Sequence, residues 1–259
     1  MALPVVLVHG GGHGAWCWAP MVDHMTSDAL AVDLPPKAVR GGPDRFRDLP
    51  ELRTITVGDF ADSVLADADA AGYDRFVLVG HSLAGLTLPE VATRAPDRVA
   101  HLVFVSCTIP TEGKSTLDRL HGDLAAMARD NVATSMSRPA TGELAESPMG
   151  EDLLRHMFGT DLDDEAMQLV FDCFGNEVMS VIDEAVSRAG MPAAIPKTWV
   201  RCLRDATLSI ADQDASVANL EAVPGGAVTV VDIDTGHNAM LSRPRDLASI
   251  VDRIAVAAT

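Results

Sequence analysis

The stretch RFVLVGHSLAG, from Arg75 to Gly85, joins a continuous apolar run to a turn of small residues. The apolar run predicts a strand buried on both faces, and the residues from Leu83 onward predict a helix that starts directly after the turn. A turn of this kind holds the side chain at its tip, here Ser82, out at the edge of a sheet. Small residues are needed because helix and strand cross closely there, and Ala84 in place of a closing glycine adds only one methyl group.

Strand and helix alternate along the rest of the chain. The expected strands are Val5 to His9, Ala29 to Asp33, Arg75 to Gly80, His101 to Ser106, Thr198 to Cys202 and Ala227 to Ile233. The expected helices are Val57 to Ala71, Leu83 to Ala95 and Arg243 to Ala257. Continuous apolar strands that alternate with helices predict an α/β fold, with a mostly parallel sheet of about six strands flanked by helices.

The alternation stops once, between the strand ending near Ser106 and the strand starting near Thr198. Residues 108–196 contain no convincing strand and are too long for a loop in a compact domain. Amphipathic stretches predict a helical lid here, inserted over the carboxyl edge of a core formed by residues 1–107 and 197–259. Methionine often lines adaptable pockets, so the large apolar residues of the lid are candidates for core or pocket lining. They are Met127, Met136, Met149, Met157, Met167, Met179, Phe158, Phe171 and Phe174.

The composition is typical of one domain with a large core. The 259 residues are 47% hydrophobic, and 37 acidic residues against 20 basic ones give a formal net charge of −17. Such a surface repels phosphate backbones and anionic membranes, so we expect neither nucleic acid nor a membrane as a partner. The start of the chain has no basic region or cleavage site, and no apolar stretch approaches the roughly 20 residues of a membrane span. We therefore expect a cytoplasmic protein.

The cysteines are widely spaced and form no CxxC pair. We expect reduced thiols, three of them in or beside apolar runs, and neither a zinc site nor a disulfide framework. The cysteines are Cys17, Cys107, Cys173 and Cys202.

A second motif, VVLVHGGGHGAW over residues 5–16, allows two functions. Gly10, Gly12 and Ala15 satisfy the GxGxxG/A spacing of a dinucleotide-binding turn. Asp33 ends the next apolar run, roughly 20 residues downstream, where a ribose contact is expected. The same turn can instead point a backbone N–H at the oxygen that becomes negative when a carbonyl is attacked. The spacing alone leaves both functions open.

Two later strands end in residues that can act with Ser82. AVTVVDIDTGHNAM places His237 on a loop after the last strand, and TWVRCLRDATLS places Asp205 directly after the preceding one. Because the carboxyl ends of parallel strands meet at one edge of a sheet, the order Ser82, Asp205, His237 predicts a catalytic triad of nucleophile, acid and base. Other carboxylates remain alternatives for the acid: Asp212, Asp214, Glu112 and Asp118.

Together, HGGGHGAWCW, GHSLAG and TGHNAML resemble the motifs of α/β-hydrolases. More narrowly, they are similar to the group of plant methyl-ester esterases and hydroxynitrile lyases, with bacterial esterase relatives. The resemblance is weak across the lid. It implies that the backbone N–H groups of Gly11 and Leu83 form the oxyanion hole. It also disfavours the dinucleotide-binding function, in which Ser82 and His237 have no role. The resemblance implies no metal and no organic cofactor.

This resemblance implies a serine hydrolase that cleaves a small to medium carboxylic ester through an acyl-enzyme. A thioesterase, lactonase, carbon–carbon bond hydrolase or lyase with the same residues stays open, as does a slow-turnover ligand-binding receptor. The lyases of the group carry a threonine and a lysine where this chain has Gly10 and Asn238, which favours ester cleavage. We expect a small ester-type molecule as the partner, and a homodimer stays open. The residues expected to line the pocket are Gly10, His13, Trp16, Asn238 and Met240.

Overall fold

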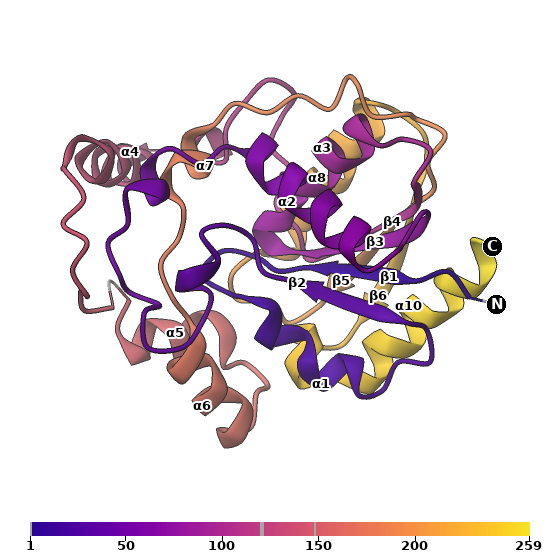
Figure 1. Cartoon of the computed structure of the whole chain (residues 1–259), viewed down its shortest axis with the longest axis horizontal. Coiled ribbons are helices and arrows are strands. Elements are labelled where there is room, and N and C mark those ends of the chain that lie inside the picture. Colours follow the sequence, from indigo (N-terminus) through magenta and orange to yellow (C-terminus); the bar gives the residue numbers. More distant parts are fainter. Residues whose placement is uncertain (1, 120–121, 148) are drawn as a thin grey trace.

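The computed structural model describes residues 2–119, 122–147 and 149–259 and contains a six-stranded sheet (Figure 1). The strand order is β2-β1-β3-β4-β5-β6, and each strand runs parallel to its neighbours. The strands are β1 Val5–Val8, β2 Ala29–Val32, β3 Phe76–His81, β4 Val99–Val105, β5 Lys197–Cys202 and β6 Val228–Ile233. The predicted α/β fold with a mostly parallel sheet of about six strands is confirmed.

Helices cover both faces of the sheet, as Figure 1 shows. Val6 and Val8 of β1 belong to the core shared with α2, α3 and α8, whereas Val5 and Leu7 point the other way, into the core shared with α1, α9 and α10. Burial on both faces explains the continuous apolar runs of the central strands β1, β3, β4 and β5. The α-helices are α1 Ala19–Val22, α2 Val57–Ala70, α3 Thr87–Arg94, α4 Gly122–Ser137, α5 Glu151–Phe158, α6 Asp164–Cys173, α7 Met179–Asp183, α8 Ile210–Ala222, α9 Ala239–Ser242 and α10 Pro244–Ala257.

Local signals set the boundaries of the helices next to the site. α2 begins at a capping box in which Thr56 and Asp59 bind each other's backbone N–H groups. The residues after β3 form a 3-10 turn over Ser82–Gly85, so α3 begins at Thr87 and not at the predicted Leu83.

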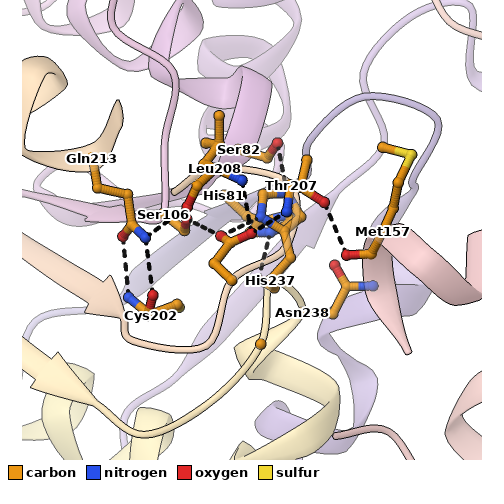
Figure 2. Close-up of polar contacts among 12 residues, drawn as sticks. His81, Ser82, Ser106, Met157, Cys202, Thr207, Leu208, Gln213, His237 and Asn238 are labelled. Atoms are coloured by element: carbon orange, nitrogen blue, oxygen red, sulfur yellow. Dashed lines mark hydrogen bonds and ion pairs between the residues drawn. The ribbon is translucent and has the colours of Figure 1, made fainter. Parts of the chain in front are cut away.

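The sequence does not predict α8, because the buried side of this helix is partly polar. Gln213 and Ser216 are fully buried there and interrupt the apolar period. The Gln213 amide binds the backbone N–H and carbonyl of Cys202 at 3.1 and 2.9 Å. The helix thereby fixes the end of β5 (Figure 2).

Between β4 and β5, the described residues form helices α4 to α7, one 3-10 turn and no strand of the sheet. Phe158 of α5 and Met167 of α6 belong to the same core as Val5 of the sheet. α4 lies farther out, at the left of Figure 1. This segment has the predicted helical character, and its division from the core as a lid over residues 108–196 stays a prediction.

Within the described residues, no helix is long and apolar enough to cross a membrane. Three of the four cysteines, Cys17, Cys107 and Cys202, are buried, as predicted, and Cys173 is half-buried.

Candidate active site

Ser82 stands at the tip of the turn between β3 and the 3-10 helix. Its φ is 54°, a left-handed value that non-glycine residues seldom adopt and that is typical of a nucleophile turn. A Cβ at Gly80 would lie 2.4 Å from a side chain of α3, and one at Gly85 would lie 2.3 Å from the carbonyl oxygen of Thr108. Glycine is therefore needed at these two positions, whereas the methyl group of Ala84 is accommodated in the core.

His237 and Asp205 meet Ser82 at the carboxyl edge of the sheet. Figure 2 shows His237 beside Ser82. His237 Nε2 lies 3.0 Å from Ser82 Oγ, and His237 Nδ1 lies 2.6 Å from Asp205 Oδ2. Because a carboxylate oxygen accepts, Nδ1 carries the proton and Nε2 is free to accept the Ser82 hydroxyl proton. The structure thus brings together the three residues that the sequence order singles out.

The Asp205 carboxylate is fully buried and bound by three further groups. Its Oδ1 accepts the N–H groups of Thr207 and Leu208 at 2.7 and 2.8 Å, and its Oδ2 accepts the hydroxyl of Ser106 at 2.5 Å. Burial acts to raise the pKa of this carboxyl, but its electrostatic interaction with His237 and these hydrogen bonds outweigh burial and lower the pKa below its ordinary value. Asp205 is therefore ionised at neutral pH and faces His237.

The four alternative acids bind partners other than His237. Two of them act at the starts of local turns or helices, and two pair with arginines or serines away from Ser82. Their partners are Ser209 for Asp212, Arg201 for Asp214, Ser187 and Arg188 for Glu112, and Ser115 and Arg129 for Asp118.

A cavity of about 260 Å³ lies over Ser82 and His237. Gly11 and Leu83, whose backbone N–H groups are the expected oxyanion donors, line the same cavity. Larger cavities of about 480 and 520 Å³ lie elsewhere and include none of these four residues. The walls over Ser82 are mainly apolar and include Met149, Met157, Phe158, Phe174 and Ile182.

Residues 5–250 match the family described as "Alpha/beta hydrolase family". The chain belongs to this family. The hydrolase is 29% identical to "Probable esterase PIR7A" of Oryza sativa subsp. indica, over 96% of this chain and 95% of the relative. It is 26% identical to "Methylesterase 2" of Arabidopsis thaliana, over 94% of this chain and 92% of that protein. A solved structure of an extracellular alpha/beta-hydrolase from a Paenibacillus species has a TM-score of 0.78 at 17% identity and covers 97% and 98% of the two chains.

The predicted α/β-hydrolase fold and hydrolase type of enzyme are confirmed by the family match. The resemblance to plant methyl-ester esterases is confirmed by the named relatives.

Gly10 and Asn238, expected in the pocket, do not line this cavity of the hydrolase. A Cβ at Gly10 would lie 2.7 Å from Ser82 Cβ and 2.9 Å from the carbonyl oxygen of His81. The missing side chain therefore leaves room for the nucleophile turn and not for an ester carbonyl. Asn238 is buried, and its amide forms no hydrogen bond within the described residues.

Among the other expected pocket residues, His13 lines the cavity, and Trp16 and Met240 do not. Trp16 stacks on the His13 imidazole with ring centroids 5.3 Å apart. Met240 is fully buried in the core because α9 begins at Ala239 and directs it inward. Both residues lie within the quoted motifs, but neither lines the cavity.

The large apolar residues of the α4 to α7 segment differ in their environments. The difference follows from α5 and α6, which each pack one side against the core. The cavity is lined by Met149, Met157, Phe158 and Phe174; the core holds Met167; Met136 is exposed and Met179 is half-buried; Arg155 lies over the Phe171 ring; and the side chain of Met127 lies outside the described residues.

The glycine turn after β1 is covered by side chains from the loop between α6 and α7. Gly12 has a φ of 67°, and a Cβ there would lie 2.2 Å from Phe174 Cζ. A Cβ at Gly11 would lie 2.3 Å from Glu177 Oε2, which accepts the Gly12 N–H at 2.9 Å. The backbones also join, since the Gly175 N–H donates to the Gly12 carbonyl at 2.8 Å. These glycines allow a distant loop to pack directly on the turn.

Two carboxylates bind the N–H groups that a dinucleotide phosphate would require. Asp33 Oδ1 accepts the Ala15 N–H at 2.6 Å, and Glu177 accepts the Gly12 N–H. Negative charge at both places repels a phosphate. The dinucleotide-binding alternative is therefore disfavoured by the structure as well.

Proposed function

We propose that the chain is a carboxylesterase that cleaves small to medium esters through a covalent acyl-enzyme. The observation that carries this proposal is the hydrogen-bonded series Ser82, His237, Asp205 at the base of an apolar cavity. The esterase names of the relatives support it. A cavity of about 260 Å³ suits substrates of this size, and its apolar walls suit uncharged acyl and alcohol groups.

The reaction begins when Ser82 Oγ attacks the ester carbonyl carbon and His237 Nε2 takes the hydroxyl proton. Asp205 stabilises the imidazolium that forms, while the N–H groups of Gly11 and Leu83 stabilise the oxyanion, by about 3 kcal/mol per donor. His237 then returns the proton to the leaving alcohol. Water, deprotonated by His237, attacks the acyl carbon, and the carboxylic acid leaves as Ser82 regains its proton.

The test is labelling by a fluorophosphonate together with turnover of 4-nitrophenyl and methyl esters. We expect the probe to modify Ser82 and no other serine, and Ser82→Ala to abolish both labelling and hydrolysis. Many turnovers per molecule distinguish an enzyme from a slow receptor. A peptide map with Ser82 unmodified in a preparation that has lost no activity would exclude the mechanism.

A parallel substrate screen separates ester cleavage from the other reactions of the same triad. Thioesters, lactones and mandelonitrile are compared with methyl esters on one preparation. We expect little cleavage of mandelonitrile, because the neutral Asn238 offers no positive charge to stabilise the cyanide that leaves. The leaving group of an ester is a neutral alcohol and needs no such charge. A mandelonitrile rate equal to the ester rate would contradict the proposal.

A further inference from the structure

Glu177, in the loop between α6 and α7, places a carboxylate in the wall of the cavity that holds Ser82 and His237. Its Oε2 accepts the Gly12 N–H at 2.9 Å, and its Oε1 accepts the Val178 N–H at 2.6 Å. Each oxygen therefore keeps a lone pair for a further donor. Burial raises the pKa of this carboxyl, against the lowering effect of the nearby Arg40 charge.

Arg40 does not satisfy the carboxylate by a direct hydrogen bond. Its guanidinium donates instead to the main-chain carbonyls of Leu34, Pro35 and Asn176, at 2.9, 3.0 and 3.2 Å. The last of these bonds holds the loop at the residue before Glu177. Arg40 thus fixes the position of Glu177 and leaves its cavity side open to a ligand.

A second acceptor lines the same cavity. His13 Nδ1 lies 2.8 Å from the Gly11 carbonyl oxygen and must donate to it, so Nε2 is the unprotonated nitrogen of a neutral ring. Burial lowers the pKa of His13 to about 4, which keeps the ring neutral at pH 7. Nε2 is buried and has no hydrogen-bond partner among the described residues. His13 is almost completely buried, and the Asn238 side chain also interacts with its ring, so Glu177 is the acceptor that a donor on the ligand can reach.

Glu177 lies next to the proposed oxyanion hole, where the carbonyl oxygen of the substrate would bind. Its Oε2 lies where a Cβ on Gly11 would point, beside the N–H that is the proposed oxyanion donor. An ionised carboxylate here disfavours the oxyanion unless a donor on the substrate shares its charge. A group on the carbon next to the ester carbonyl is placed to do so.

We propose that Glu177 makes the esterase select acyl groups that carry a hydroxyl or amino group beside the ester carbonyl, and reject those that carry a carboxylate there. This inference rests on the proposed esterase function. It names Glu177 as a specificity-determining residue.

The test compares three methyl esters that differ in one substituent: methyl mandelate with a hydroxyl, methyl phenylacetate with hydrogen, and monomethyl phenylmalonate with a carboxylate. The kcat/KM ratio of mandelate to phenylacetate should be at least about 10-fold higher in the wild type than in Glu177→Leu, because a hydrogen bond to a charged group is lost. Intrinsic ester reactivity cancels in this comparison. Glu177→Gln should raise the phenylmalonate to phenylacetate ratio by about 10-fold, because the repelling charge is removed.

Glu184 supplies a matched control. It is also partly buried and accepts a backbone N–H, that of Val57 at 2.8 Å, but it lines a different cavity. Glu184→Gln should leave both ratios unchanged. Equal mandelate to phenylacetate ratios in the wild type and Glu177→Leu would overturn the inference while ester cleavage stands. Failure of the wild type on every ester would overturn the proposed function and this inference together.

A measurement on the wild type alone covers the case in which the Glu177 variants do not fold. Two ketones of matched shape, 1-hydroxy-1-phenylpropan-2-one and 1-phenylpropan-2-one, are compared as competitive inhibitors. The hydroxyketone should have an inhibition constant lower by about 10-fold, since it can donate to the carboxylate. Equal inhibition constants would overturn the inference.

Discussion

Asp205 carries four hydrogen bonds on its two oxygens, from Thr207, Leu208, Ser106 and His237. Asp205→Asn keeps the shape but can present an NH₂ group to His237 Nδ1, which favours the wrong tautomer. We expect kcat to fall by about 10⁴-fold, as in the well-studied serine protease triad. The measurement is 4-nitrophenyl ester hydrolysis under saturating substrate.

Asp212→Asn is the control for this change, since the Asp212 carboxylate caps α8 through Ser209 and pairs with Arg119, and does not contact His237. If Asp205→Asn kept near wild-type activity while Glu112→Gln were inactive, the acid of the triad would be Glu112, after an earlier strand, and not Asp205.

Ser106 is a positioning residue, because its hydroxyl reaches Asp205 and not the cavity. Ser106→Ala removes one donor from the carboxylate that orients His237, so we expect kcat to fall about 10-fold with KM within about twofold. Ser187→Ala is a matched control, because the Ser187 hydroxyl donates at the same 2.5 Å to Glu112 outside the site. A change in KM alone would assign Ser106 to binding.

The sequence predicts residues well where a strand end fixes their place. Ser82, Asp205 and His237 each follow a strand of the parallel sheet, so the edge rule for parallel sheets brings them together. Ser106 directly follows β4, so the same rule could have placed it near the site. Glu177 carries no such signal, because its place depends on how a distant loop packs on the glycine turn.

At the scale of elements, the contact between the glycine turn and the α6–α7 loop should be measurable as coupling. Gly12→Ala puts a methyl group at a positive φ and into the Phe174 ring, so we expect it to lower the free energy of unfolding by more than about 2 kcal/mol. In Gly12→Ala combined with Phe174→Ala, the clash is absent. The combined cost should be smaller than the sum of the single costs by at least about 1 kcal/mol. Urea unfolding gives the free energy of unfolding of the two single variants and the double variant. If the two single costs simply added, the α6–α7 loop would not be packed against the glycine turn.

The helices and strands could be predicted from the sequence where their buried side chains are apolar. The six strands follow from their apolar runs, with ends that differ by one or two residues. α8 was not predicted, because Gln213 on its buried side interrupts the apolar periodicity. The Gln213 amide hydrogen-bonds to the backbone of Cys202. Met240 lies in the core and not in the pocket because of where α9 begins. The motif before this helix does not indicate that starting point.

For the whole molecule, three buried histidines should make the fold sensitive to acid. Burial lowers the pKa of His9, His13 and His81, to about 4 for His13 against its ordinary 6.5. The neutral ring is favoured in the folded state, so the stabilisation is full above pH 6.5 and is lost as pH falls toward 4. For His13 this loss is about 3 kcal/mol.

We expect the wild type to lose about 3 kcal/mol more than His13→Phe between pH 8 and pH 4, because phenylalanine cannot take up a proton. Denaturant unfolding at each pH gives the two curves. His24→Phe, at an exposed histidine, should follow the wild type. Parallel curves for the wild type and His13→Phe would mean that the ring accepts a proton without cost.

The packing of Phe174 on Gly12 also constrains how this enzyme can diverge. Positions 12 and 174 lie far apart in the chain, yet only a glycine at the first leaves space for a phenylalanine ring at the second. Descendants that gain a side chain at position 12 must therefore carry a smaller residue at position 174. An alignment of many homologues should show these two positions changing together, because their side chains compete for one fixed volume.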